Sequence, residues 1–536
     1  MTSPASSSPA DCAWGAFDQV APWVLDPNNI AWEKQAIELR ISAQREVPVL
    51  TTPTRIPPVA RLVVVVWVLS KALLPWLIKK KLRPFATPED SRAYISLRMR
   101  KAVERLGSTY IKLGQIISSG EGLFPVELVN EFKLCRDQVP AIPFESVKKT
   151  IESELGKPLN EVFSFIDTTA LAAASIAQVH LATLLTGEEV VVKVQRPTVS
   201  KMVRKDLRVM AWIAPHLVGR IKVSALANPP ALVELFAETI VEELDFRIEA
   251  SNMLDVAKML CELHQDRYII PRPHPTLATQ RVLVMQRLSG FKFDDVAGMK
   301  DAGIDTHAVI RTGMIAFMEG AMIYGVFHGD LHGGNLFVMP DGRTALLDFG
   351  IVGRLTGARR MAFLRLMLNA TTNNVVGQVE ALRDLGALPM DTDIHAVIKD
   401  LNLGDAAIDP TSLSGEELVK EVQRIVKALM GYGARMPKEL MLYVKNMVFL
   451  DGAIARLAPE LDILAEIASI SMLFAERHGE RLGRELGVDH TAIEINLDSV
   501  KTGVLGVDAS VNSLTYRDLQ ARRELIQKRM RDHVGR

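Results

Sequence analysis

Cysteine is scarce in this chain of 536 residues: Cys12, Cys135 and Cys261 are far apart and form no CxxC pair. A disulfide framework or a structural zinc cluster needs more cysteines at closer spacing, so both are excluded and we expect reducing, cytoplasmic surroundings. A surplus of one charge is also missing, since 63 Lys and Arg face 63 Asp and Glu. Phosphate contacts need a basic surplus, so we expect no nucleic-acid partner. The oligomeric state stays open.

Long hydrophobic runs are few. The most apolar run, Leu62 to Ile78, is followed by the basic residues Lys79, Lys80 and Lys81. As a helix its 17 residues extend about 25 Å, short of the about 30 Å of a bilayer core, and Lys71 lies near its middle. We therefore favour a buried helix, or a helix peripheral to an anionic membrane surface, over a spanning helix.

The remaining pattern predicts an α+β fold, with a small β-containing lobe followed by a larger helical lobe and helical additions in front. Two-residue turns at Thr186-Gly187 and Asp341-Gly342 predict β-hairpins. A second strand pair ends in RVLVMQRLSG, at residues 281–290. Helices are predicted for residues 89–135, 144–165, 231–263, 357–483 and the tail from residue 513.

These elements group into five segments. Residues 1–60 are predicted to be a disordered lead and linker, 61–150 a helical extension, 151–290 the β-containing N-lobe, 291–483 the helical C-lobe, and 484–536 a C-terminal tail.

The most specific pattern is FHGDLHGGN (327–335) followed by LLDFG (346–350). Phosphoryl transfer from a nucleotide needs one carboxylate near the acceptor, and an amide oxygen and a second carboxylate as ligands for Mg²⁺. Asp330, Asn335 and Asp348 supply these groups, and the predicted hairpin returns Asp348 to the side of Asn335. Each motif alone has a plainer alternative. His328, Asp330 and His332 alternate, as polar residues of a strand or metal ligands do, and DFG alone is typical of a turn.

A lysine inside an apolar strand marks a second piece of the same site. Lys193 in VVVKV is costly to bury unless it has an anionic partner, which a nucleotide phosphate and a helix glutamate would provide. Glu242, Glu243 and Glu249 are the candidate glutamates. A lysine that extends from an edge strand into water is the alternative for Lys193 alone.

Glycine-rich phosphate motifs are absent upstream of Lys193, where the sequence has neither GxGxxG nor GxxxxGK[ST]. The small residues Ala172 to Ser175 occupy that place and let a backbone approach phosphates with less conformational freedom than glycine gives. The start of a helix is an equal alternative for this stretch. Further upstream, Lys112 and Gln115 in YIKLGQ share one face of a predicted helix, which by itself is a solvated face.

Taken together, these motifs resemble the AarF/UbiB family of atypical protein-kinase-like proteins over roughly residues 90 to 480. The family's signatures stand here as KxGQ (Lys112, Gly114, Gln115), the Ala-rich nucleotide loop (Ala172, Ala173, Ala174, Ser175), the strand lysine (Lys193), ExD (Glu243, Asp245), the helix glutamate (Glu249), the catalytic loop (Asp330, Asn335) and DFG (Asp348).

The resemblance implies a bilobal protein-kinase-like fold that binds ATP or ADP with Mg²⁺. It implies Lys193, Glu249 and Asp330 as the catalytic set, Asn335 and Asp348 as metal ligands, and ATPase or lipid-linked phosphotransfer activity. It also implies a supporting role in ubiquinone-type biosynthesis or membrane-lipid homeostasis, with an anionic lipid or a quinone precursor as partner.

In the family the KxGQ helix folds across the site and blocks protein substrates, so the resemblance implies a gate formed by this helix and ExD, with Lys112 facing Glu243. Two departures stand out. Ser119 to Gly122 replaces an Arg-Pro-Asp run after KxGQ, and the chain ends in a charged helix where some members have apolar segments.

Three alternatives are weighed against this function. An ordinary protein kinase is disfavoured because the sequence after DFG runs almost directly into a helix and leaves little platform for a peptide. A small-molecule phosphotransferase of the aminoglycoside or choline type shares the HGDLHxGN-like loop but lacks the KxGQ helix. A nucleotide-gated scaffold would bind Mg-nucleotide without turnover.

Overall fold

The computed structural model describes residues 30–83, 85–118, 124–135, 140–218, 228–372, 374–401, 431–487 and 513–534, with a few single positions between them. Its contacts divide the chain into two units. Unit 1 contains residues 1–290, 334–339 and 343–352, and unit 2 contains residues 291–333, 340–342 and 353–536.

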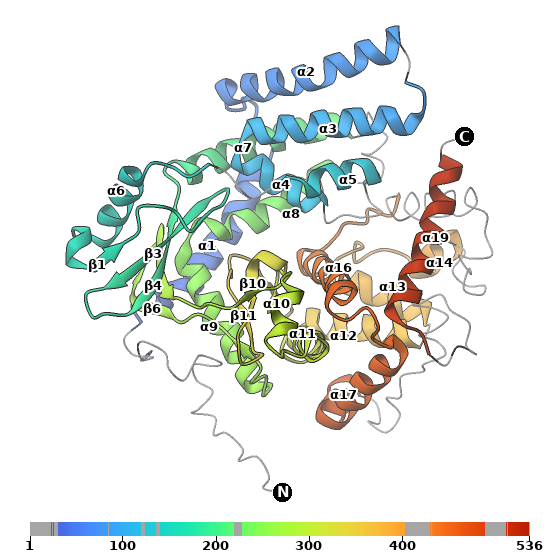
Figure 1. Ribbon diagram of the computed structural model, residues 1–536. Coiled ribbons are helices and arrows are strands. Elements are labelled where there is room, and N and C mark those ends of the chain that lie inside the picture. Colours follow the sequence, from blue (N-terminus) through green and yellow to red (C-terminus); the bar gives the residue numbers. More distant parts are fainter. Residues whose placement is uncertain are drawn as a thin grey trace, which may run out of the picture. The chain divides into compact units, whose positions relative to one another are not determined.

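The centre of unit 1 is a six-stranded sheet in the order β1-β3-β4-β7-β6, with β2 beside β3 (Figure 1). Every second residue of the valine-rich strand β4 is buried against helix α6, through Val147 and Ile151 of that helix. The turn between β3 and β4 confirms the first predicted hairpin. The bounds are β1 Phe163–Ile166, β2 Ala172–Ala173, β3 Ala177–Leu184, β4 Glu189–Gln195, β6 Pro273–Ala278, β7 Val282–Gln286 and α6 Phe144–Leu155.

A second, small sheet in unit 1 carries the DFG segment. Strand β10 (Leu336–Val338) pairs antiparallel with β11 (Thr344–Leu346), and β11 pairs parallel with β5 (Tyr268–Ile269). Gly342 in the turn has a φ of 82°, a left-handed conformation that glycine adopts without strain. The second predicted hairpin is confirmed.

Helices make up the rest of unit 1. Helix α1 contacts α7, α8 and α9, whereas α4 contacts α3, α5, α7 and α8. The helices are α1 Glu33–Thr51, α2 Val59–Leu82, α3 Pro88–Leu106, α4 Ser108–Ser118, α5 Val126–Lys133, α7 Val199–Leu217, α8 Pro229–Ile240 and α9 Phe246–Glu262, with the short helices η1 Leu159–Glu161 and η3 Glu242–Leu244.

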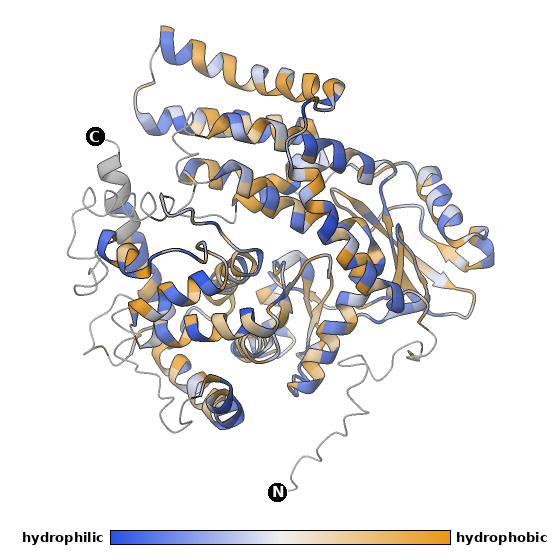
Figure 2. Cartoon of the chain, turned by 180° about the vertical axis from the view of Figure 1, so that it is seen from behind, coloured by the Kyte–Doolittle hydropathy of each residue, from blue (hydrophilic) through white to orange (hydrophobic). Residues whose placement is uncertain are grey.

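Helix α2 contains the apolar run predicted from the sequence. Among the described residues it is the one helix long and apolar enough to cross a membrane by length and composition, and only 17% of its most apolar window is buried. Figure 2 shows hydrophobic colour along much of this helix. Val63, Val66, Trp67 and Leu74 are among its exposed side chains.

Unit 2 is mainly helical. Phe317 of α11 stacks on Tyr443 of α16, and Phe327 and Phe363 pack edge-on against the same tyrosine. The elements after residue 290, apart from β10 and β11, are β8 Phe291–Lys292, α10 Val296–Asp301, α11 Thr306–Glu319, η4 Gly320–Tyr324, β9 Val326–His328, η5 Gly333–Asn335, β12 Val352–Arg354, α12 Gly357–Thr371, α13 Val375–Asp384, α14 Ile394–Asp400, α16 Lys438–Leu457, α17 Ile463–Leu486 and α19 Tyr516–Val534.

Three expectations need correction. The helix predicted over residues 144–165 ends at Leu155, because Gly156 adopts a left-handed conformation there and β1 follows. The helix predicted over 231–263 is two helices, because Asp245 leaves helical geometry and caps α9 with its side chain. Residues 33–51, placed in the linker, form α1, whose mixed pattern and Pro48 obscure its helical period.

The cysteines also depart from the expectation of reduced thiols. Cys135 is free and buried, whereas Cys261 is disulfide-bonded. Ser119 to Gly122, where the motif departs from the family, lie outside the described residues.

Candidate active site

The centre of the candidate site in unit 1 is the ammonium group of Lys193. Strand β4 places this residue on the inner part of the sheet, where its Nζ donates to Glu249 Oε1 of α9 at 2.6 Å and to Asp348 Oδ1 at 3.3 Å. Lys193 and Glu249 are buried, while the Asp348 side chain is 46% exposed. Two carboxylates from distant parts of the chain thus share one buried cation.

Electrostatics explain how this cation stays charged. Burial by itself lowers the pKa of Lys193, but the charges of Asp348 and Glu249 outweigh it and raise that pKa above its ordinary value. Burial raises the pKa of Glu249, and the Lys193 ammonium opposes the shift. Lys193 is therefore held protonated at neutral pH, as a phosphate-binding lysine must be.

Helix α9 also holds the DFG segment in place. Glu249 accepts a hydrogen bond from the backbone N–H of Phe349, and Asn252, three residues further along the same face, donates to the Phe349 carbonyl at 2.8 Å. The Phe349 side chain is fully buried, and the Gly350 N–H donates to Asp348 Oδ1 at 2.9 Å. The same helix face therefore fixes both the lysine and the aspartate that follows β11.

The KxGQ helix, α4, reaches the same region. Lys112 Nζ lies 3.2 Å from Glu243 Oε2, and both side chains are largely buried. A Cβ built on Gly350 would lie 3.5 Å from Cγ of Glu243 and 3.3 Å from Oδ1 of Asp348. The ion pair between Lys112 and Glu243 therefore lies directly beside the DFG segment.

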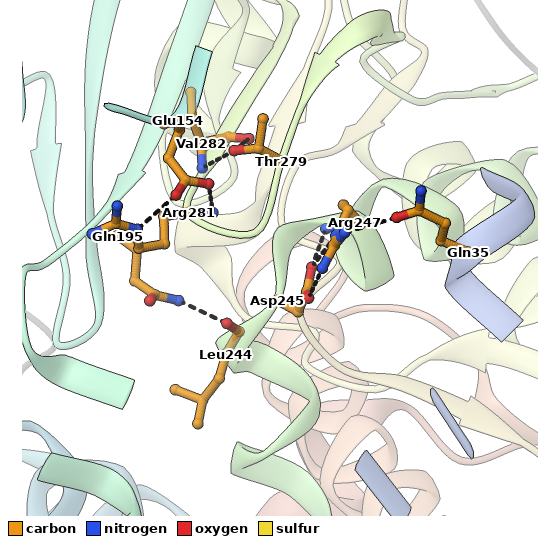
Figure 3. A network of polar contacts seen from close by, with 9 residues as sticks. All are labelled: Gln35, Glu154, Gln195, Leu244, Asp245, Arg247, Thr279, Arg281 and Val282. Atoms are coloured by element: carbon orange, nitrogen blue, oxygen red, sulfur yellow. Dashed lines mark hydrogen bonds and ion pairs between the residues drawn. The ribbon is translucent and has the colours of Figure 1, made fainter. Parts of the chain in front are cut away.

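The other residues of the predicted gate differ in their contacts. Gly114 is buried where α4 meets α3 and α5, and Gln115 is half-buried one position further on. Asp245 points to Arg247, which it binds through both carboxylate oxygens, and Arg247 reaches Gln35 of α1 (Figure 3). Asp245 therefore begins α9 and braces it against α1.

The Ala-rich stretch forms a strand and a tight turn. Ala172 and Ala173 pair with β3, and the Ala174 N–H donates to the carbonyl of Ala177 at 2.8 Å, so the alternative of a helix start is wrong. Arg196, at the end of β4, donates to the Ala174 carbonyl at 2.9 Å and to the carbonyl of Pro140. Ser175 is buried in the same turn.

The β10–β11 hairpin brings the two predicted metal ligands to one end. The Leu347 N–H donates to the Asn335 carbonyl at 3.0 Å, so Asp348 follows the residue paired with Asn335. An amide oxygen and a carboxylate are hard oxygen donors, and Mg²⁺ keeps waters and phosphate oxygens as its other ligands. The donor set therefore fits Mg²⁺ bound together with a nucleotide.

Asp330 lies in unit 2, with contacts of its own. Its N–H donates to Nδ1 of His328 at 3.1 Å, and Lys445 of α16 donates from Nζ to its Oδ1. Asn446, fully buried, accepts from the Leu331 N–H at 3.0 Å and donates to the His328 carbonyl. Helix α16 thus holds the loop around Asp330.

Within unit 1 the structure brings together Lys112, Lys193, Glu243, Glu249 and Asp348, and it shows which of the candidate glutamates meets the lysine. Sequence reasoning missed Asn252, Lys445 and Asn446, and it gave no role to Arg196. The one usable signal was Asn446, because a polar residue on the apolar stripe of a helix needs a partner.

The fold and these side chains define a class. A β-containing lobe whose strand lysine meets a helix glutamate and a DFG aspartate, followed by a helical lobe, is a protein-kinase-like fold. Residues 134–382 match the model of the ABC1 atypical kinase-like domain. The chain belongs to this AarF/UbiB family of atypical kinase-like proteins.

Two curated relatives and one solved structure illustrate the similarity. An uncharacterized chloroplastic aarF domain-containing protein kinase of Arabidopsis thaliana is 32% identical, over 69% of this chain and 73% of the relative. The probable protein kinase UbiB of Pseudomonas putida is 30% identical, over 74% of this chain and 73% of the relative. A Mycobacterium tuberculosis protein solved in complex with erythromycin is 21% identical, covering 61% of this chain and 89% of that one with a TM-score of 0.36.

Proposed function

We propose that this protein binds ATP or ADP with Mg²⁺ and acts as an atypical kinase or ATPase. The observation that carries the proposal is the buried ammonium of Lys193 between Glu249 and Asp348. A cation kept charged in a buried place, beside a partly exposed carboxylate, suits a ligand that is both anionic and metal-bound.

Each residue has a proposed part. Lys193 neutralises the α- and β-phosphates, and Glu249 fixes its position. Asn335 and Asp348 hold Mg²⁺, which when bound supplies positive charge to the phosphates. The turn at Ala172–Ser175, braced by Arg196, lies over the nucleotide, and Asp330 orients the attacking water or acceptor hydroxyl.

The acceptor is proposed to be small or lipid-linked, not a protein. The ion pair between Lys112 and Glu243 places the KxGQ helix beside the DFG segment, which supports a gate against large substrates. Only six residues separate Gly350 from the start of α12 at Gly357, which supports the lack of a peptide platform. We place the protein in ubiquinone-type biosynthesis or membrane-lipid homeostasis, in line with its similarity to a UbiB protein.

Membrane association through α2 forms part of this proposal. Arg61 of α2 binds the fully buried Asp206 of α7 at 2.5 Å and the Leu106 carbonyl at 2.6 Å. Thr109 of the KxGQ helix hydrogen-bonds to the same aspartate. Helix α2 and the proposed gate therefore share one anchor, through which an anionic lipid or a quinone precursor at α2 would affect Lys112.

The test is a thermal-unfolding titration of the full chain with ATP and ADP, with and without Mg²⁺. A nucleotide at 100 times its Kd should stabilise the protein by about 2.7 kcal/mol. This gain should require Mg²⁺ and vanish in Asp348→Asn. If no nucleotide stabilises the wild-type protein, the proposal is wrong.

A second variant separates an enzyme from a scaffold. Asp330→Asn should keep the Mg-nucleotide stabilisation and lose about 10²- to 10⁴-fold in ATP turnover, the usual contribution of a proton-accepting side chain. A variant with unchanged turnover would remove Asp330 from the reaction. A wild-type protein that binds Mg-ATP without any turnover would favour the nucleotide-gated scaffold.

A further inference from the structure

The ion pair between Lys445 and Asp330 joins two segments of unit 2 that are 115 residues apart in the chain. Its side chains are 22% and 17% exposed, so the pair is reachable by solvent but not fully hydrated. Nothing in the sequence motifs points to Lys445, which stands in an ordinary amphipathic helix.

The position of Lys445 is fixed by its neighbour. Asn446 makes two hydrogen bonds to the loop, one with Leu331 and one with His328, the residues on either side of the 329–330 dipeptide. Asn446 is fully buried, so its two hydrogen bonds hold α16 against the loop. This places Lys445, the preceding residue of the helix, next to Asp330. A lysine on an open surface, by contrast, samples many rotamers and meets a nearby carboxylate in only some of them.

The ion pair with Lys445 also supplies a positive charge next to the carboxylate of Asp330. Residues 327–335, FHGDLHGGN, contain no lysine or arginine, and the ammonium beside Asp330 comes from another element, α16. An ammonium carries three N–H donors, more than the contact with Asp330 uses. Preorganised donors beside developing negative charge are among the largest contributions to catalysis.

We infer that Lys445 is the positioning residue of Asp330: it holds the carboxylate toward the attacking hydroxyl and balances charge during transfer. The inference rests on the proposed function. In that reaction the nucleophile's oxygen bonds to the γ-phosphorus, the bond from phosphorus to the bridging oxygen breaks, and ADP leaves with the electron pair. The nucleophile's proton passes to Asp330, which becomes neutral.

The experiment measures kcat and KM for Mg-ATP in the wild-type chain and in Lys445→Met, Lys445→Arg and Arg456→Met. Lys445→Met should lower kcat about 10²-fold, the usual cost of removing one preorganised donor, with KM for ATP within threefold. Lys445→Arg keeps a cation and should recover at least tenfold of that loss. Arg456, an exposed basic residue of the same helix, is the matched control, and its replacement should change neither constant.

Two further measurements exclude a purely structural effect. Lys445→Met should keep the thermal transition and the Mg-nucleotide stabilisation of the wild-type protein. In Lys445→Ala, added ethylammonium should restore part of kcat, which a folding defect would not allow. A variant that loses its thermal transition, or a loss that neither arginine nor amine repairs, would make Lys445 structural and overturn the inference.

The outcomes separate the inference from the proposed function. If the wild-type chain turns over Mg-ATP and Lys445→Met stays within threefold of it, only the inference is overturned. If the wild-type chain shows no turnover, the catalytic part of the proposed function fails, and the inference fails with it.

Discussion

Two lysine–carboxylate clusters, one in each unit, use the same chemical groups in different surroundings. In unit 1 the side chains of Lys193 and Glu249 are 11% and 4% exposed, and a second carboxylate, Asp348, shares the ammonium. In unit 2 the side chains of Lys445 and Asp330 are 22% and 17% exposed. The pair of Lys193 and Glu249 has lost most of its water, whereas Asp348, 46% exposed, and the second cluster retain some.

The difference in burial separates two kinds of work. A desolvated cluster cannot lose one partner cheaply, because an unpaired charge in a buried place costs several kcal/mol. A partly hydrated pair contributes little to folding, and water replaces a missing partner. We therefore expect damage to the first cluster to reduce both stability and nucleotide binding, and damage to the second to reduce turnover alone.

The largest effect on stability should come from Lys193→Met. This change leaves Glu249 and Asp348 as two carboxylates without their shared cation and should lower the free energy of unfolding by about 3–5 kcal/mol. It should also abolish stabilisation by Mg-ATP. Denaturant unfolding of the nucleotide-free chain measures the first effect, and thermal shift with nucleotide measures the second.

The loss should depend on pH with a defined sign. Burial already raises the pKa of Glu249, and without the ammonium that pKa rises further. A carboxyl group whose folded-state pKa lies above its unfolded value adds stability at low pH and loses it as the pH increases. The deficit of Lys193→Met should therefore be smaller at pH 5 than at pH 8. Lys445→Met is the comparison, with an expected change below about 1 kcal/mol at either pH, and an equal loss in both variants would end the distinction between the clusters.

The sequence predicts the parts of the site that local rules determine. The turn residues at 186–187 and 341–342 predict the hairpins that carry Lys193 and Asp348, and a charged residue in a valine-rich strand predicts a buried partner. Local rules cannot choose between Glu242, Glu243 and Glu249, because the choice depends on where α8 ends and α9 begins. The family resemblance selects Glu249, and the structure places it against the lysine.

Other features depend on contacts between distant residues. Lys445 is an unremarkable helical lysine until Asn446 docks α16 on the loop, and the polar Asn446 on an apolar helix stripe signals a partner without saying which one. The prediction of one continuous helix over 231–263 is wrong at Asp245, whose side chain caps α9 and binds Arg247. A capping aspartate inside an apolar pattern is easily taken for a solvated position.

Arg61→Met tests whether burial alone accounts for the stability effect. Asp206, its partner, is fully buried but has no proposed part in the reaction, and burial raises its pKa. The substitution leaves the buried carboxylate of Asp206 without its cation. It should lower the free energy of unfolding by about 3 kcal/mol, at the lower end for a broken buried ion pair, because Arg61 is itself partly exposed.

The Mg-nucleotide stabilisation should survive in Arg61→Met, unlike in Lys193→Met. Arg105, an exposed arginine of the neighbouring α3, is the matched control, and Arg105→Met should leave unfolding unchanged within about 0.5 kcal/mol. If Arg61→Met abolished nucleotide binding as well, stability and binding in unit 1 would not be separable, and the comparison between the clusters would lose its basis.

The smallest effect is expected at the edge of the unit 1 cluster, in Lys112→Ala. Lys112 forms an ion pair with Glu243 beside the DFG segment and is not part of the hydrogen bonds of Lys193. Its removal should therefore change the ratio of ATP to ADP affinity, by about fivefold, or about 1 kcal/mol. Turnover should also change when anionic liposomes are present, if the KxGQ helix is a gate. Titrations of both nucleotides with and without liposomes measure these effects, with Lys101→Ala, an exposed lysine of α3, as the control.

A double-mutant cycle shows whether this effect passes through Glu243. If it does, Glu243→Gln should produce the same change in preference, and adding Lys112→Ala to it should produce little more. Additive changes would mean that Lys112 acts without Glu243. An unchanged preference together with unchanged turnover on liposomes would remove the gate from the proposal while leaving the nucleotide site intact, because the hydrogen bonds from Lys193 to Glu249 and to Asp348 do not involve Lys112.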